Sequence, residues 1–257
     1  MSIFNRLKQV IYIVKLFIVK NYLKFNYLYG IIVFFFISEV IINPIGEFSL
    51  NDDWAYSKTV YNFINNGSIE APDWGGATFL TQLILAVTFC KFFGFSFTLL
   101  RIIGVVTGVF GIVIMYYILM QIQDSKKLAT IGSLLFGMNP IYLNGANSFH
   151  PDVPTAFFML LSFYCFIKFF HNHTISLYVL GVLFSLIACT IKQTSLSIGI
   201  AFFIYFLLTS KTNIRNIIIA MFPFFLMGSL IYIYHIAITS YNVGLPGALI
   251  QKDLYNI

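Results

Sequence analysis

Charged residues are scarce in this sequence of 257 residues, and their scarcity excludes an ordinary water-soluble domain. Only 9% of the residues are charged and 59% are apolar, whereas soluble domains average about a quarter charged. Apolar segments of about 20 residues, the length that crosses a bilayer, follow one another along the chain. The composition therefore indicates an all-α integral membrane protein with several spanning helices.

Closely spaced metal ligands are also lacking. The three cysteines are scattered and have the character of small apolar helix residues, and the four histidines do not have the spacing of zinc ligands. Repeats of fixed period and low-complexity linkers are absent from the sequence, so we expect a single membrane domain over residues 1–257.

The net charge of +6 does not indicate a nucleic-acid partner. The basic residues fall in short clusters between apolar segments instead of a groove-like run with interleaved aromatics, and such clusters set membrane topology. Residues 1–26 intersperse lysines with apolar residues and have no signal-peptide cleavage site, so we expect them to remain and to lie in the cytoplasmic interface.

The apolar segments predict about seven transmembrane helices. Residues 44–95 form the expected first external loop, with interfacial helices at 54–64 and 77–93, residues 96–239 form the transmembrane bundle, and residues 240–257 form an external tail. The expected spans are residues 27–45, 96–122, 128–145, 155–170, 174–191, 196–208 and 217–239.

Basic residues fix the orientation of this arrangement. With residues 77–93 at the outer interface, Lys126, Lys127, Lys211 and Arg215 lie in the cytoplasm, as the positive-inside rule requires. A seventeen-residue span at that position would place all four outside. We therefore expect a multi-pass protein of the cell membrane, with its N-terminus in the cytoplasm and its first loop outside.

Acidic residues then gather at the outer face. Asp52 and Asp53 begin the helix of the first loop, and Asp152 follows His150 in the turn two spans later. An aspartate at a helix start can simply cap free backbone N–H groups, and the pattern alone favours that role at each position. Two carboxylate sites at one membrane depth, however, are costly and typical of a functional site.

Lys192 and Arg101 are expected at the same depth as these carboxylates. Lys192 is either a lysine that extends from a helix end to the interface or a ligand of a phosphate group. Arg101, at the start of a span, has the position of an interfacial anchor.

The run from Asp52 to Tyr56, after a first span, resembles the Asp-Glu/Asp-x-x-Tyr motif of C-type (GT-C) glycosyltransferases that use polyprenyl-phosphate sugars. The resemblance continues through Arg101, then Asp152, then Lys192, and is strongest to the protein O-mannosyltransferase and lipid A aminoarabinose transferase groups. It implies a GT-C-like fold and transfer of a sugar from the lipid carrier to an acceptor hydroxyl at the outer face, the acceptor being a lipid, a glycan or a protein.

Roles for individual residues follow from the same resemblance. Asp52 is placed at the acceptor as general base, and Lys192 stabilises charge on the departing phosphate. The catalytic residues expected are Asp52, Asp53 and Asp152. The substrate-binding residues expected are Tyr56, Arg101, His150 and Lys192.

Three alternatives stay open at this point. The resemblance covers the N-terminal half of such enzymes, so the chain could be a catalytically incomplete fragment or subunit. A transporter or flippase component is disfavoured, because its charges would lie at mid-membrane on broken helices. No cofactor is evident, although a divalent ion held by Asp52 and Asp152 suits hard carboxylate oxygens.

Overall fold

The computed structural model describes residues 27–50, 52–67, 69, 77–209 and 213–241 of the chain. These residues form helices joined by short connections, which confirms the all-α membrane protein expected from the sequence. The expected cytoplasmic segment at 1–26 and nearly all of the expected tail at 240–257 lie outside the described residues.

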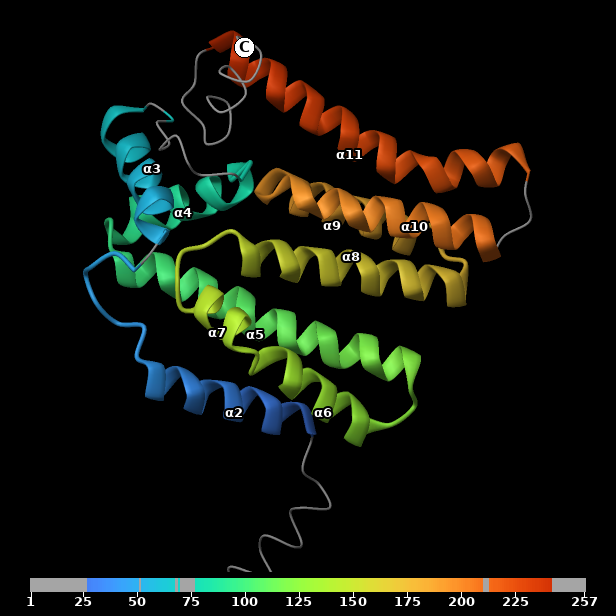
Figure 1. Cartoon of the computed structure of the whole chain (residues 1–257), viewed down its shortest axis with the longest axis horizontal. Coiled ribbons are helices and arrows are strands. Elements are labelled where there is room, and N and C mark those ends of the chain that lie inside the picture. The colour runs from blue at the N-terminus through green and yellow to red at the C-terminus, as the bar shows by residue number, and fades with distance from the viewer. Residues whose placement is uncertain (1–26, 51, 68, 70–76, 210–212, 242–257) are drawn as a thin grey trace, which may run out of the picture.

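Seven helices lie side by side and alternate in direction along the chain (Figure 1). They are α2 (Tyr27–Ile42), α5 (Phe97–Ile122), α6 (Lys126–Gly137), α8 (Asp152–Asn172), α9 (Ile175–Ile191), α10 (Leu196–Thr209) and α11 (Ile214–Tyr241). The helices α3 (Asp53–Asn66) and α4 (Leu80–Phe93) lie together beyond one end of this bundle. We call this end of the bundle the loop end, and the α7–α8 and α9–α10 connections also lie there. The opposite end, which we call the far end, contains the α5–α6 and α8–α9 connections.

Three helices are long and apolar enough to cross a membrane: α5, α8 and the Ile214–Tyr234 part of α11. The segments Tyr27–Ile42, Leu80–Phe93, Ile175–Ile191 and Gln193–Thr209 are apolar but have 10–17 residues. At 1.5 Å per residue, 17 residues span about 26 Å, somewhat less than the hydrocarbon core of about 30 Å. The count of seven spans therefore stays a prediction, with three spans supported by length.

One expected span is wrong. The segment expected as a single helix at 128–145 consists of α6 and a second helix, α7 (Pro140–Ala146). Proline lacks the N–H that a continuing helix needs, and Pro140 begins α7 after Asn139, whose Oδ1 accepts the Ile141 N–H at 2.9 Å as a cap. The break shortens α6, which runs from the far end toward the loop end.

The short helix expected at 54–64 is present as α3, which ends at Gly67 with a left-handed φ of 70°. Its Tyr56 and Val60 pack with Phe79 and Leu83 of the α4 region and with Phe149 of the α7–α8 connection. These buried side chains form one apolar cluster at the loop end. They fix α3 and α4 against the bundle.

Gly104 allows α5 to approach the α7–α8 connection closely. A Cβ atom at Gly104 would lie 2.7 Å from the Ala146 carbonyl oxygen and 2.8 Å from that of Ser148. Both neighbours are backbone atoms, which cannot rotate away as a side chain can. The close packing of this region against α5 therefore depends on the absence of a side chain at Gly104.

Candidate active site at the loop end of the bundle

Asp152 is the centre of a small polar cluster at the start of α8. Its Oδ2 lies 2.8 Å from His150 Nδ1, and its Oδ1 accepts a hydrogen bond from Lys192 Nζ. The Asp152 side chain is 51% exposed, and those of His150 and Lys192 are about half as exposed. The structure thus brings together three of the residues expected from the sequence, and they are accessible.

Tyr56 connects this cluster to the first loop. Its ring meets that of His150 edge-on, with 5.5 Å between the centroids, and only 6% of the residue is exposed. Burial, together with the negative charges of Asp152 and Asp52, raises the pKa of Tyr56 to about 12. The two carboxylates expected from the sequence therefore lie near the same tyrosine.

Asp52 stands at the N-cap position of α3 but does not cap it. Its backbone is helical, with φ −72° and ψ −7°, and its carboxylate makes no capping hydrogen bond within the described part of the chain. A capping side chain usually sits on an extended backbone and accepts an N–H two or three residues later. The half-buried carboxylate of Asp52 is thus left available for other partners.

Asp53 and Arg101 form a buried ion pair, with Arg101 Nε 3.4 Å from Asp53 Oδ2 and both side chains at most 1% exposed. The Leu50 N–H donates to Asp53 Oδ1 at 2.6 Å. Burial raises the pKa of the Asp53 carboxyl, while the Leu50 N–H and the Arg101 charge act in the opposite direction. Neither side chain can touch a substrate in this conformation, which differs from the catalytic and substrate-binding roles expected from the sequence.

Arg101 instead organises the backbone of the first loop. Its guanidinium donates to the carbonyl oxygens of Pro44 at 3.3 Å and Gly46 at 3.1 Å, and also to that of Phe48. The same group lies over the Phe48 ring, 5.0 Å from its centroid. Arg101 thereby fixes the segment that leads from α2 to Asp52.

Lys192 is positioned by contacts between the start of α4 and the end of α9. The Phe79 N–H donates to the Ile191 carbonyl at 2.8 Å, and Thr78 Oγ1 donates to the Cys189 carbonyl at 2.8 Å. Phe79 has a left-handed φ of 59°, unusual for a bulky residue. The α9 helix ends directly after these contacts, and the extended backbone of Lys192 directs the chain into the next turn.

Glu47 is a residue that the sequence reasoning missed. Its carboxylate accepts hydrogen bonds from Ser96 Oγ at 2.5 Å and from the backbone N–H of Phe97 at 2.9 Å, at the start of α5. The hydrogen bond from Ser96 is the main cause that lowers the Glu47 pKa to about 2. Glu47 and Ser96 are far apart in sequence, so only the fold shows this contact.

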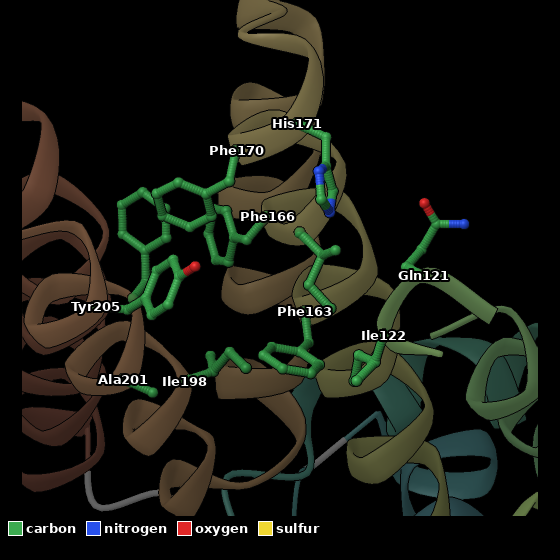
Figure 2. Close-up of a pocket in the computed structure, with 11 residues that line it drawn as sticks. Gln121, Ile122, Phe163, Phe166, Phe170, His171, Ile198, Ala201 and Tyr205 are labelled. Carbon is green, nitrogen blue, oxygen red and sulfur yellow. The ribbon is translucent and has the colours of Figure 1, made fainter. Parts of the chain in front are cut away.

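A cavity lies elsewhere, at the far end of the bundle. It has a volume of about 610 Å³ and is lined by residues of α5, α8 and α10. In Figure 2 the rings of Phe163, Phe166, Phe170 and Tyr205 face it, with His171 and Gln121 at its rim. Because its lining is mostly apolar, we assign the candidate chemistry to the polar cluster at the loop end.

No group of three or more His, Cys, Asp or Glu side chains able to hold a metal occurs among the described residues. Both oxygens of Asp152 already have cationic or hydrogen-bonding partners in His150 and Lys192.

Comparison with known proteins identifies a family and a relative. Residues 78–241 match the family described as dolichyl-phosphate-mannose-protein mannosyltransferase. An uncharacterized protein of Aquifex aeolicus is 29% identical over 161 residues, which are 60% of this chain and 32% of the relative. The chain therefore covers about a third of that relative. The family match includes Arg101, His150, Asp152 and Lys192 and leaves out Asp52 to Tyr56.

Proposed function

Since the chain belongs to the dolichyl-phosphate-mannose-protein mannosyltransferase family, with more than half of its residues in the match, we propose that it serves in sugar transfer at a membrane. The donor is a polyprenyl-phosphate-linked sugar, and the acceptor is a hydroxyl group of a lipid, glycan or protein. The reaction takes place at the outer face of the cytoplasmic membrane, with the N-terminus of the chain in the cytoplasm.

One observation carries this proposal. Asp52, a carboxylate without a capping role, lies near Tyr56, and so does Asp152, which forms an ion pair with Lys192 from a distant part of the sequence. A transferase of this type needs a base for the acceptor and a cation for the leaving phosphate. In this proposal Asp52 is the base and Lys192 is the cation, and the buried Asp53–Arg101 pair supports the first loop beside them.

The proposed step moves one proton and one sugar. Asp52 accepts the proton of the acceptor hydroxyl as the acceptor oxygen forms its bond to the anomeric carbon. The bond between that carbon and the phosphate oxygen breaks, and the phosphate leaves with the electron pair. Lys192 stabilises the charge that grows on the phosphate.

The other residues of the cluster have positioning roles in this proposal. Asp152 and His150 orient Lys192, since Asp152 contacts both at once. Tyr56 packs against His150 and lies near both carboxylates. Asp53 and Arg101 act through the loop backbone, because both are buried away from any substrate. Lys192 supplies the cation that a divalent ion would otherwise provide, so chelation with EDTA should leave transfer unchanged.

The test is transfer of radiolabelled sugar from polyprenyl-phosphate donors, measured in membranes of the native host that carry the chromosomal variant Asp52→Asn. Asparagine is nearly the same size as aspartate and caps helices equally well, but it takes no proton at neutral pH. We expect a loss of about a hundredfold or more in rate. Asp124→Asn at the far end is the matched control and should transfer normally. Wild-type transfer by Asp52→Asn at equal protein level would refute the role of Asp52.

A further inference from the structure

Glu39 is an acidic residue near the loop end of the apolar helix α2, and it is only 5% exposed. It takes part in none of the ion pairs found among the described residues. The cation of the neighbouring helix α5, Arg101, is paired with Asp53 instead. A buried carboxylate without a cationic partner is costly at membrane depth, so its hydrogen bonds are informative.

Asn147, which caps the end of α7, is the polar neighbour of Glu39. Its Nδ2 donates one hydrogen to Glu39 Oε1 at 3.2 Å and the other to the Leu143 carbonyl at 2.9 Å. Both amide hydrogens are therefore used. Reversing the amide would set its oxygen against two other oxygens, so the orientation is fixed by its partners.

Four buried side-chain oxygens have no hydrogen-bond partner in the described part of the chain, and two of the four belong to this pair. One is Glu39 Oε2 and the other is Asn147 Oδ1. They belong to the two groups that are already joined by the first hydrogen bond. An ionised carboxylate has no hydrogen to give, so both oxygens would stay unsatisfied, at a cost that native structures generally avoid.

We propose that Glu39 is held as an uncharged carboxylic acid whose Oε2–H donates to Asn147 Oδ1, so that the two side chains form a cyclic acid–amide pair. A single hydrogen then satisfies both oxygens. It also removes the buried charge. The pair fastens α2 to the end of α7, which leads through Ser148 and Phe149 to His150 and Asp152.

This assigns Glu39 a positioning role for the site. The α7–α8 connection packs closely against Gly104 of α5. It also contacts the first loop, because the Phe149 N–H donates a hydrogen bond to the Asp53 carboxylate. Glu39 adds the support from α2. The effect on transfer rests on the proposed function, but the protonation of Glu39 does not.

The first experiment detects the proton directly. Infrared spectra of the purified full chain in lipid nanodiscs are compared for wild type, Glu39→Gln and Glu47→Gln, in H₂O and D₂O at neutral pH. We expect the C=O band of a protonated acid to disappear in Glu39→Gln and to shift in D₂O. Glu47→Gln, at an exposed carboxylate, should keep it. If Glu39→Gln instead loses the band of an ionised carboxylate, Glu39 is charged and the proposal is overturned.

The second experiment tests positioning. Glutamine at position 39 offers an N–H donor and a carbonyl acceptor on one amide group, so Glu39→Gln can form the same cyclic pair with Asn147. It should transfer sugar within about twofold of wild type, whereas Glu39→Ala, which leaves the amide partly unsatisfied, should lose about tenfold or more per folded molecule. Equal loss in both variants would mean that a charge is required and would overturn the proposal. If wild type itself transfers nothing, the proposed function fails while the infrared result stands.

Discussion

The two ends of the helix bundle are held together by different forces. At the loop end, charged and polar side chains join segments far apart in sequence, as in the Asp53–Arg101 and Asp152–Lys192 pairs. At the far end, aromatic rings of α8 and α10 pack on one another, with 4.1 Å between the centroids of Phe166 and Phe202. Polar contacts depend on direction and on each partner, whereas ring packing depends mainly on volume.

This difference indicates where the molecule tolerates change. The far end retains a cavity of about 610 Å³ among its aromatic residues, and its contacts can be rearranged with little loss. At the loop end, removal of one partner leaves another buried group unsatisfied. The following predictions test this contrast, beginning with the largest effect.

Arg101→Ala should be the most damaging change at the loop end. It leaves the Asp53 carboxylate buried without its cation and frees three backbone carbonyls of the first loop. Breaking a buried pair in this way typically costs about 3–5 kcal/mol. Thermal unfolding in detergent would measure it. Asp53→Leu combined with Arg101→Met should recover part of the loss, and a double variant as unstable as Arg101→Ala would contradict this account.

Gly104→Ala should destabilise the protein by about 1–3 kcal/mol, because the new methyl group meets two backbone carbonyls of the α7–α8 connection. Gly132→Ala on α6 is the matched comparison, since a Cβ there meets Leu119 Cδ1, the end of a side chain that can rotate. There the helix propensity gained, up to about 1 kcal/mol, should offset most of the clash. Equal losses of unfolding free energy at the two positions would contradict the expected difference between a backbone clash and a side-chain clash.

Glu47→Gln should cost about 0.3–1 kcal/mol at neutral pH, because it removes a negative charge from the start of α5. The pKa of Glu47 is about 2 in the folded protein and its ordinary value is 4.5. The ionised group therefore stabilises the fold above about pH 4.5, and this contribution is lost as the pH falls toward 2. Unfolding measured between pH 7 and pH 3 should show wild type approaching Glu47→Gln; a constant difference would exclude Glu47 as the titrating group.

Ala201→Leu should have the smallest effect. Ala201 faces the far-end cavity (Figure 2), where three added carbon atoms have room. We expect unfolding free energy within about 0.5 kcal/mol of wild type and unchanged sugar transfer. A tenfold loss of transfer in correctly folded protein would show that the far-end cavity belongs to the reaction path.

The sequence was sufficient for the all-α membrane class and for much of the cluster. Hydrophobic periodicity and length located α5 and α8 to within a few residues, and the alternation of helix direction placed Asp152 and Lys192 at one end before any contact was known. Such inferences work because a helix that crosses a membrane must form its backbone hydrogen bonds internally, and the chain must reverse direction after each crossing.

The pairing of particular side chains could not be predicted. Arg101 at the start of an apolar helix has the pattern of an interfacial anchor, and only the path of residues 44–50 around it shows that it is buried. The contact of Glu47 could not be predicted either, since its partner Ser96 is 49 residues away. The break before Pro140 did have a local signal, because proline cannot continue a helix.

The hydrogen bond between Phe79 and Ile191 also has a consequence for biogenesis. Its partners are separated by all of α4, α5, α6, α7, α8 and α9, whereas Asp53 and Arg101 are separated by 48 residues. A chain synthesised from its N-terminus can close the Asp53–Arg101 contact once α5 begins, but the Phe79 contact must wait until α9 has been inserted. Lys192 would then reach its place after Asp53, Arg101 and Asp152, so the nascent chain passes through a stage with a closed Asp53–Arg101 contact and without Lys192 at Asp152.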